Sequence, residues 1–264
     1  MKTAVLYIAT GRYLTFWKDF FESSERYFLR GIHKSYFVFT DSSPSDVAHS
    51  CSSKVNVFHL DKYGHPRDTL YRFRTFLTAE SELEGFDYIF FFNANVKFVR
   101  EVNADILPSA GEGLVCALHP LMSKADNKSY PYERDSGSLA YIPMGSGKVY
   151  VQGALIGGTS KAFLDMSRQL KKNIDDDLDK GIVAVWHDES HLNRYILKKN
   201  PKLLGLEYLC PDTLKYRRRC GWRQKILLLE KSSFKYGGID YIRGKTDKKI
   251  GIFRYFLRKV FHCA

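Results

Sequence analysis

A run of five polar residues, His187 to His191, is the densest cluster of side chains in this chain that could do chemistry. It precedes Leu192 and Tyr195, whose spacing predicts that the cluster opens a helix. A carboxylate there, Glu189, could stabilise an oxocarbenium-like centre or attack it. Asp188 also fits a simpler role, because acidic residues at a helix start are favoured by the helix dipole.

His187 and His191 lie four residues apart, a spacing that puts two imidazoles on one face of a helix and suits zinc. Metalloproteases use His-Glu-x-x-His, whereas here the glutamate comes second and the sequence offers no apparent third ligand. We therefore expect no metal at this cluster.

Asn93 and Asn95 follow an aromatic and β-branched run, Phe86 to Phe92, which predicts a strand buried on both faces of a sheet. In open α/β sheets the ligand crevice lies beyond the carboxyl ends of such strands. Two neutral amides at that point could hydrogen-bond a sugar or a diphosphate, or could simply form an Asx-type turn.

Three basic residues, Arg12, Arg72 and Lys235, could neutralise phosphates. Each of them taken alone fits a solvated surface charge better. A nucleotide-linked sugar as substrate would account for the cations, the amides and the carboxylate together.

The elements that must position these residues alternate between strand and helix, which indicates the α/β class. Strands are predicted at residues 4–9, 36–41, 55–60, 86–92, 114–118 and 149–156, and helices at 15–29, 68–84, 161–175 and 186–198. Polar loops are predicted at 42–53 and 123–137. Residues 1–238 are expected to form one domain.

The composition bounds the function. With 264 residues, 44% of them hydrophobic, the chain can bury a sizeable core. Its formal charge of +12 favours anionic partners: phosphorylated small molecules, nucleic acid or an acidic membrane face. The five cysteines are odd in number and scattered, which disfavours a disulfide framework. No segment has the apolar length of a transmembrane helix, and we expect a cytoplasmic protein.

The chain ends in a basic segment, residues 239–264, which is expected to be a tail outside the domain. Between Lys245 and Lys259 apolar and basic residues are interleaved so that a helix would gather the apolar ones on one side. Such a helix could contact the inner face of an anionic membrane peripherally, or it could dock on the protein's own core. The sequence leaves both readings open.

Several motifs, in this order and spacing, resemble those of glycosyltransferase family 6, which includes the blood-group A and B transferases, the α-1,3-galactosyltransferases and short bacterial relatives. They are Ile8 to Tyr13, Phe90 to Asn95, Tyr132 to Arg134, Ala140 to Pro143, Gly157 to Thr159 and Trp186 to Asn193. The resemblance runs from about Val5 to Tyr236. It implies a GT-A fold with a mixed central sheet flanked by helices, and retaining transfer of a sugar from a UDP-sugar to galactose through an α-1,3 linkage.

The resemblance also implies roles for single residues. Glu189 matches the residue proposed as nucleophile or ion-pair stabiliser, and Asp188 matches one that binds the donor sugar. Positions that hold the rest of the donor are matched by Ile8, Thr10, Tyr13 and Arg72, and more loosely by Lys235 and Arg243 in a C-terminal segment that closes over the diphosphate. The acceptor side is implied at His119, Leu121, Met122 and His187, where Leu121-Met122 replaces an aromatic pair of the animal members.

The stretch Asn93-Ala94-Asn95 departs from the family, because animal members carry Asp-x-Asp there and hold a divalent cation that bridges the UDP diphosphate. Amides are poor ligands for hard divalent cations and bring no charge. Some bacterial members look the same at this position. We therefore predict transfer without a metal cofactor, with lysine or arginine side chains supplying the positive charge on the leaving UDP.

Donor choice is implied at Gln152-Gly153-Ala154, since the last of these positions lies against the 2-substituent of the sugar in the family. Glycine there accompanies GalNAc transfer and alanine accompanies Gal, so Ala154 predicts UDP-Gal, with UDP-GalNAc as the alternative. The acceptor is expected to be a galactose-containing glycan, fucosylated by analogy with bacterial relatives, or a lipid-linked precursor.

Two classes compete with an enzyme. A basic nucleic-acid-binding protein would use the +12 charge, but that charge is spread through the chain without an aromatic and basic motif of a known RNA-binding type, so no nucleic acid is expected. A sugar-binding protein that has lost catalysis would explain the missing aspartates, but Glu189 argues against it.

Overall fold

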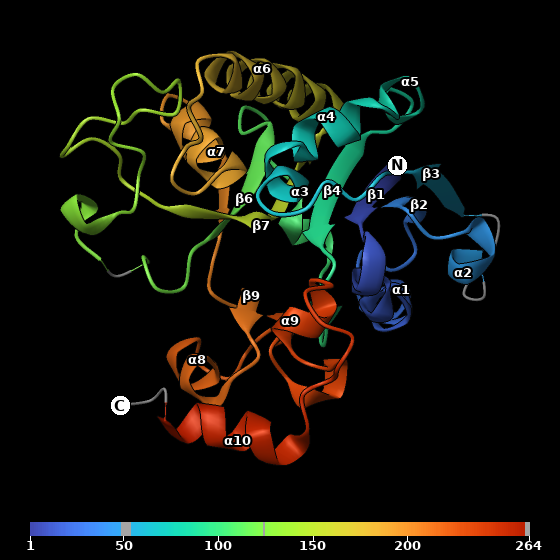
Figure 1. Cartoon of the computed structure of the whole chain (residues 1–264). Helices are drawn as coiled ribbons and strands as arrows, with labels where there is room; N and C mark the ends of the chain where they lie inside the picture. Colours follow the sequence, from blue (N-terminus) through green and yellow to red (C-terminus); the bar gives the residue numbers. More distant parts are fainter. Residues whose placement is uncertain (49–53, 124, 262–264) are drawn as a thin grey trace.

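The computed structural model describes residues 1–48, 54–123 and 125–261. Its centre is a seven-stranded sheet in the order β3-β2-β1-β4-β7-β6-β8 (Figure 1). The strands are β1 (Lys2–Ile8), β2 (His33–Thr40), β3 (Val55–His59), β4 (Tyr88–Asn93), β6 (Leu114–Leu118), β7 (Val151–Thr159) and β8 (Lys202–Leu204). β7 runs antiparallel to both of its neighbours, and the other pairs are parallel. The mixed α/β architecture predicted from the sequence is confirmed and is consistent with a GT-A-type fold.

Alternate side chains of the central strands enter two separate cores, one on each face of the sheet. On one face Tyr7 and Phe92 pack against Trp17 and Phe20 of α1 (Trp17–Tyr27). On the other face Phe91 meets α4 (Arg72–Leu77) and α6 (Ser160–Asp179). The helices on both faces explain why the strands read as continuous apolar runs.

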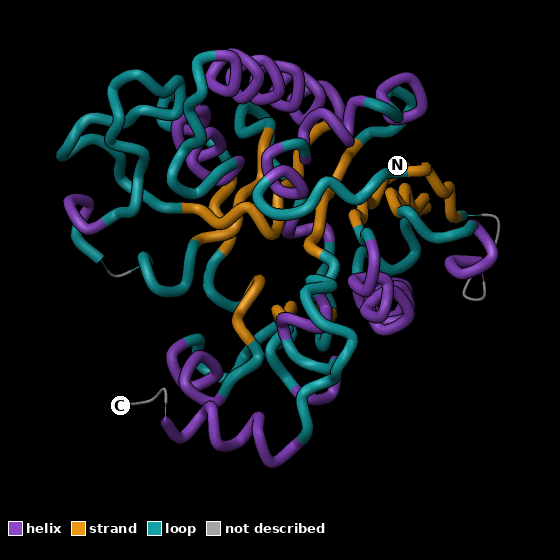
Figure 2. Tube along the Cα trace, viewed as in Figure 1, coloured by secondary structure: helices purple, strands orange, loops and turns teal. Residues whose placement is uncertain are grey.

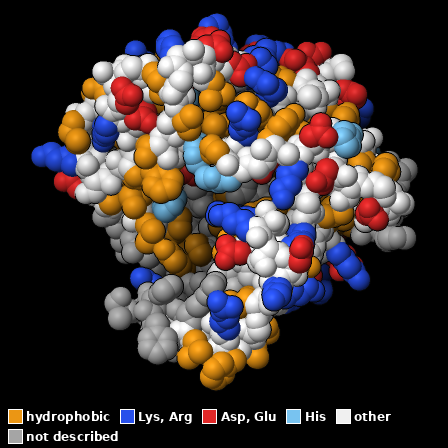
Figure 3. Space-filling view, in the orientation of Figure 1, with side chains coloured by type: hydrophobic (Ala, Val, Ile, Leu, Met, Phe, Trp, Pro, Cys, Tyr) orange, Lys and Arg blue, Asp and Glu red, His pale blue; other side chains and the backbone are white. Residues whose placement is uncertain are grey.

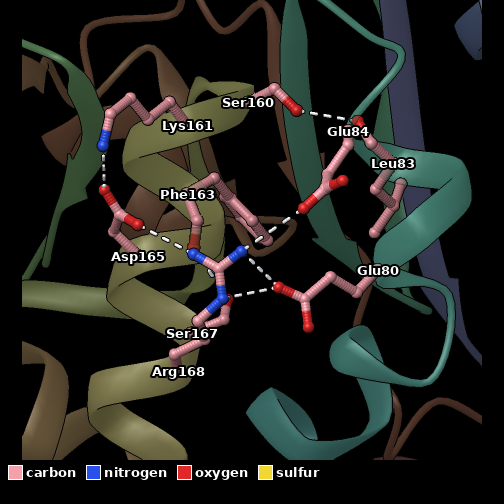
Figure 4. A network of polar contacts seen from close by, with 9 residues as sticks. All are labelled: Glu80, Leu83, Glu84, Ser160, Lys161, Phe163, Asp165, Ser167 and Arg168. Carbon is pink, nitrogen blue, oxygen red and sulfur yellow. Dashed lines mark hydrogen bonds and ion pairs between the residues drawn. The ribbon is translucent and has the colours of Figure 1, made fainter.

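The predicted helix at 68–84 is divided into three short helices, α3 (Arg67–Leu70), α4 and α5 (Glu80–Leu83). The predicted helix at 161–175 is longer and runs through α6. Arg168 of α6 joins it to α5 by ion pairs with Glu80 and Glu84, and Ser160 donates to the Leu83 carbonyl at 2.8 Å (Figure 4). The polar loop predicted at 42–53 contains a short helix, α2 (Pro44–Ala48), and its residues 49–53 lie outside the described part.

A second, three-stranded sheet lies below the first and consists of β5 (Val96–Phe98), β10 (Ile226–Leu228) and β9 (Tyr208–Pro211), with α8 (Leu214–Arg219) beside it (Figures 1 and 2). β8, β9 and β10 were not predicted, because strands of three or four residues show no measurable alternation. β4 ends at Asn93 as predicted, and the turn at 94–95 sends the chain into the second sheet.

The remaining helices border these sheets: α7 (Asp188–Ile196), α9 (Ile239–Ile242) and α10 (Ile252–Phe261), with the 3₁₀ turns η1 (Gly11–Phe16), η2 (Ala104–Ile106), η3 (Asn127–Ser129) and η4 (Phe234–Tyr236). α9 contacts η1 through a small core of Phe16, Leu229 and Ile242. Arg12 of η1 donates to the Tyr241 carbonyl at 2.9 Å and lies over that tyrosine ring. Residues 239–250, expected to belong to a separate tail, are therefore tied to the start of the domain.

One side of α10 packs on the domain, and the helix also exposes apolar side chains to solvent. Tyr255 is buried, contacts Phe234 at 5.5 Å between ring centroids and donates to Glu230 at 2.8 Å. Four apolar side chains of the same helix are 40–76% exposed, namely Ile252, Phe253, Phe256 and Leu257. In the described residues, none of the helices has the length and apolarity needed to cross a bilayer.

Candidate active site

A pocket of about 590 Å³ lies where β1 and β4 end. Its lining includes Ile8, Thr10 and Tyr13 after β1, and Asn93 to Asn95 after β4. Cationic side chains from distant segments also line it: Lys62, Arg72, Lys231, Arg243 and Lys245. In Figure 3, Lys, Arg and His side chains border the hollow at the centre of the molecule. We call this cavity the central pocket.

Arg72, from α4, is the hub of this region and is buried. Its guanidinium pairs with Asp188 at 2.6 Å, donates to the Gly153 carbonyl at 2.5 Å and reaches the Asn93 side-chain oxygen at 3.3 Å. Burial raises the pKa of Asp188, and the charge of Arg72 opposes that rise. Arg72 thus connects the central pocket to the polar cluster at the start of α7.

Glu189 has both carboxylate oxygens fixed. Tyr150 donates its hydroxyl proton to Oε1 at 2.8 Å, and the Gly153 backbone N–H donates to Oε2 at 2.7 Å. The pKa of Glu189 is raised to about 7, because burial and the Asp188 carboxylate outweigh the two hydrogen bonds and the charge of Arg72, which oppose the rise. A carboxylate with such a pKa changes protonation near neutral pH, as acid–base and nucleophilic groups of enzymes often do.

The start of α7 has an unusual backbone. His187 precedes the helix with φ +53° and ψ −126°, in the left-handed region that costs a side chain free energy. Its ring lies 5.1 Å from that of His65, which lines the central pocket. This turn lets Asp188 and Glu189 begin the helix beside Arg72, which lines the pocket.

His191 lies away from this edge. It is 1% exposed, and its Nε2 is 3.6 Å from Asp177 of α6. His191 therefore faces α6 rather than the central pocket. Within the described ranges, moreover, no group of three or more His, Cys, Asp or Glu side chains is placed to hold a metal ion.

The β7 residues Gln152, Gly153 and Ala154 lie at a register shift, where Cys116 of β6 faces Ile156 but Ala117 faces Gln152. Such bulges re-aim the strand next to a site. The Gln152 amide nitrogen donates to the carbonyls of Leu118 and Leu209, so it holds the two sheets together. A Cβ on Gly153 would meet Arg72 Nη1 at 3.0 Å, so a larger residue there would press on the Arg72 guanidinium.

The Asn93-Ala94-Asn95 turn is fixed by its neighbours. The hydroxyl of Tyr7 donates to the Ala94 carbonyl at 3.0 Å, and the Asn95 side-chain nitrogen donates to the Leu229 carbonyl at 2.6 Å. Asn93 offers its oxygen to Arg72, as described above. The turn therefore presents no carboxylate, and Arg72, Lys231 and Arg243 are among the cations that line the same pocket. The turn and its cations therefore make a poor site for a divalent cation, which is usually held by carboxylates as well as by neutral oxygens.

Lys231 is the functional candidate that the sequence did not reveal. Burial, together with the charges of Arg243 and Arg72, lowers the pKa of Lys231 to about 8. Lys235, which was predicted at the donor, lies elsewhere: its ammonium is 3.8 Å from Asp19 and lines a different cavity, next to Tyr236. Both lysines belong to one irregular segment, so no periodicity could have distinguished them.

The predicted acceptor residues do not line the central pocket but lie beside Glu189. The ring of His119 is 5.7 Å from that of Tyr150, the tyrosine that binds Glu189. Met122 packs against a small core that contains Tyr130, Tyr132 and Tyr150, and Leu121 is 40% exposed. Trp186, not singled out beforehand, is 50% exposed directly before His187. Its backbone carbonyl accepts from the Glu189 N–H at 3.0 Å, so this exposed ring belongs to the same turn as the carboxylate.

Comparison with known proteins is decisive for the family. The sequence model of glycosyltransferase family 6 matches residues 2–230. The chain is 34% identical over 210 residues to globoside α-1,3-N-acetylgalactosaminyltransferase 1 of Gallus gallus, covering 77% of this chain and 60% of that protein. The chain belongs to glycosyltransferase family 6.

Two further members of family 6 extend the comparison. The O-antigen biosynthesis glycosyltransferase WbnI of Escherichia coli is 33% identical over 79% of this chain and 87% of its own length. The histo-blood group ABO system transferase 1 of Rattus norvegicus is 32% identical over 83% of this chain and 60% of its own. The chain thus spans less than two thirds of the animal relatives but most of the bacterial one. The family predicted from the motifs is confirmed.

Proposed function

We propose that this chain is a retaining hexosyltransferase that moves a sugar from a UDP-sugar to a glycan acceptor. The observation that carries the proposal is the fixed carboxylate of Glu189, held by Tyr150 and by Gly153, whose carbonyl accepts from Arg72 of the cation-lined pocket. A carboxylate there stabilises or captures the positive anomeric carbon as the bond to UDP breaks. The uridine would lie against Ile8, Thr10 and Tyr13.

The reaction is proposed to need no divalent metal. Negative charge develops on the departing diphosphate, and preorganised cations aimed at that charge lower the barrier. Arg72, Lys231 and Arg243 would supply this positive charge, and they come from separate segments of the chain. The two asparagines bind protein groups rather than offering a ligand set, which supports the same conclusion.

The donor is proposed to be UDP-Gal. Ala154 is 7% exposed, one residue after the glycine that contacts both Arg72 and Glu189. A methyl that overlaps an acetamido group costs about 1–3 kcal/mol, a bias rather than a bar. The alternative is UDP-GalNAc, the type of donor sugar named for the Gallus gallus relative.

For the acceptor we propose the 3-hydroxyl of a galactose, in a fucosylated glycan or glycolipid, linked α-1,3. The apolar face of galactose would lie on Trp186, with His119 and His187 nearby. A cytoplasmic enzyme that touches an anionic membrane peripherally suits a lipid-linked acceptor. The exposed apolar side chains of α10, together with the exposed cations Lys248, Lys249 and Arg254, provide the surface for that contact.

The test is a matrix of UDP-Gal and UDP-GalNAc against fucosylated and plain galactosides, run with and without EDTA. We expect transfer from UDP-Gal that EDTA leaves intact and that Glu189→Gln abolishes. Activity that vanishes with EDTA and returns with Mn²⁺ would overturn metal independence. Sugar binding without turnover would instead support a non-catalytic lectin, and binding of nucleic acid without either would support the other competing class.

A further inference from the structure

The two asparagines of the turn use opposite ends of their amides. Asn93 accepts through its oxygen, from Arg72. Asn95 donates through its nitrogen, to the Leu229 carbonyl, and its own oxygen is buried without a partner among the described residues. Only nitrogen can face a carbonyl, so the orientation of the Asn95 amide is set by chemistry.

The contact of Asn95 with Leu229 continues the second sheet. The last paired residues of β5 and β10 are Val96 and Leu228, and the next pair would be Asn95 and Leu229. The Leu229 N–H donates to the Asn95 carbonyl at 2.7 Å, as in a regular antiparallel pair. The second bond of that pair, to the Leu229 carbonyl, comes from the Asn95 side chain. Asn95 is 2% exposed and Leu229 is 7% exposed, so water does not replace this bond.

Lys231 follows Leu229 by two residues and enters the central pocket. Its ammonium lies 5.4 Å from the centre of the Tyr13 ring. The neighbouring charges of Arg72 and Arg243 repel it, and its burial is unfavourable, so its place depends on how firmly the backbone at 229–231 is held. Asn95, two residues after the end of β4, fixes this backbone through its hydrogen bond to the Leu229 carbonyl.

We propose that Asn95 is a positioning residue that fixes Lys231 against the diphosphate of the donor, through a hydrogen-bond donor that an aspartate lacks. This inference rests on the proposed function. An aspartate at residue 95 would put a carboxylate oxygen against the Leu229 carbonyl, and the two acceptors would repel each other. An asparagine at residue 95 therefore goes together with Lys231 as the source of positive charge. Exchanging Asn95 for aspartate would displace Lys231 without providing a complete metal site in its place.

The experiment is a double-mutant cycle of Asn95→Ala and Lys231→Ala, read as the dissociation constants of UDP and uridine by calorimetry in EDTA. Lys231→Ala should weaken UDP about ten- to a hundred-fold and leave uridine unchanged, because charge-assisted contacts to phosphate are lost. Asn95→Ala should weaken UDP about ten-fold, again without affecting uridine. In the double variant UDP should bind as weakly as to Lys231→Ala alone, because residues that act through one another are not additive.

The matched control is the same cycle with Asn93→Ala, which acts on Arg72. Its fold-change in the dissociation constant of UDP should multiply with that of Lys231→Ala. If the Asn95 and Lys231 effects also multiply, or if Asn95→Ala weakens uridine as much as UDP, the inference is overturned while the role of Lys231 stands. If Lys231→Ala leaves UDP binding unchanged, both fail. Should Asn95→Ala not fold, Asn95→Asp takes its place in the cycle, and the same non-additivity is required of it.

Discussion

The pH dependence of donor hydrolysis tests the two charged groups together. The proposed mechanism requires Glu189 ionised and Lys231 protonated, and their pKa values are about 7 and about 8. The rate should therefore rise as Glu189 loses its proton and fall as Lys231 loses its own. With these two values kcat/KM should peak near pH 7.5 and fall about seven-fold at pH 6 and at pH 9.

Lys231→Arg identifies the group behind the alkaline limb. Arginine keeps its charge throughout this range, so the variant should retain the acid limb and hold its activity to pH 9 even if its maximum is lower. The assay is release of UDP from UDP-Gal without acceptor, measured from pH 5 to 10 at constant ionic strength. An alkaline limb that persists in Lys231→Arg, or a flat profile in the parent enzyme, would refute the assignment.

Three further predictions concern the donor, the stability and the tail. Ala154→Gly should raise kcat/KM for UDP-GalNAc relative to UDP-Gal about ten-fold or more, since it removes the methyl that opposes the acetamido group; equal use of both donors by the parent enzyme would contradict this. Glu189→Gln should stabilise the fold at pH 8 by up to about 3 kcal/mol and not at pH 4. The reason is that a carboxyl whose pKa is raised to about 7 in the folded state lowers the free energy of unfolding as the pH climbs from about 4.5 to 7. Equal shifts in melting temperature at both pH values would show that the buried charge of Glu189 is not the cause. Phe253→Glu with Phe256→Glu should abolish sedimentation with vesicles containing phosphatidylglycerol but leave activity on a soluble acceptor unchanged, and binding to neutral phosphatidylcholine vesicles as strong as to anionic ones would contradict the charge argument.

Much of the fold could be predicted because its signals are local. The apolar runs of β1, β4 and β7 and the helical spacing of α6 follow from periods of a few residues. The single helix predicted at 68–84 is three, because its apolar spacing does not report the breaks at Tyr71 and Ala79. The short strands of the second sheet carry too few residues to show any period at all.

The sequence by itself determined the family and the α/β class, and it singled out Glu189 as the candidate carboxylate, since Trp186 to Asn193 is a contiguous motif at one helix start. Only the tertiary structure decided which distant segments meet at the site. Arg72 meets Gly153 across 81 residues, and Asn95 meets Leu229 across 134. Those contacts depend on the order of strands in two sheets, which no local pattern encodes. The tertiary structure also puts Lys231, and not Lys235, in the lining of the central pocket, and it joins each of the two asparagines to a distant segment of the chain.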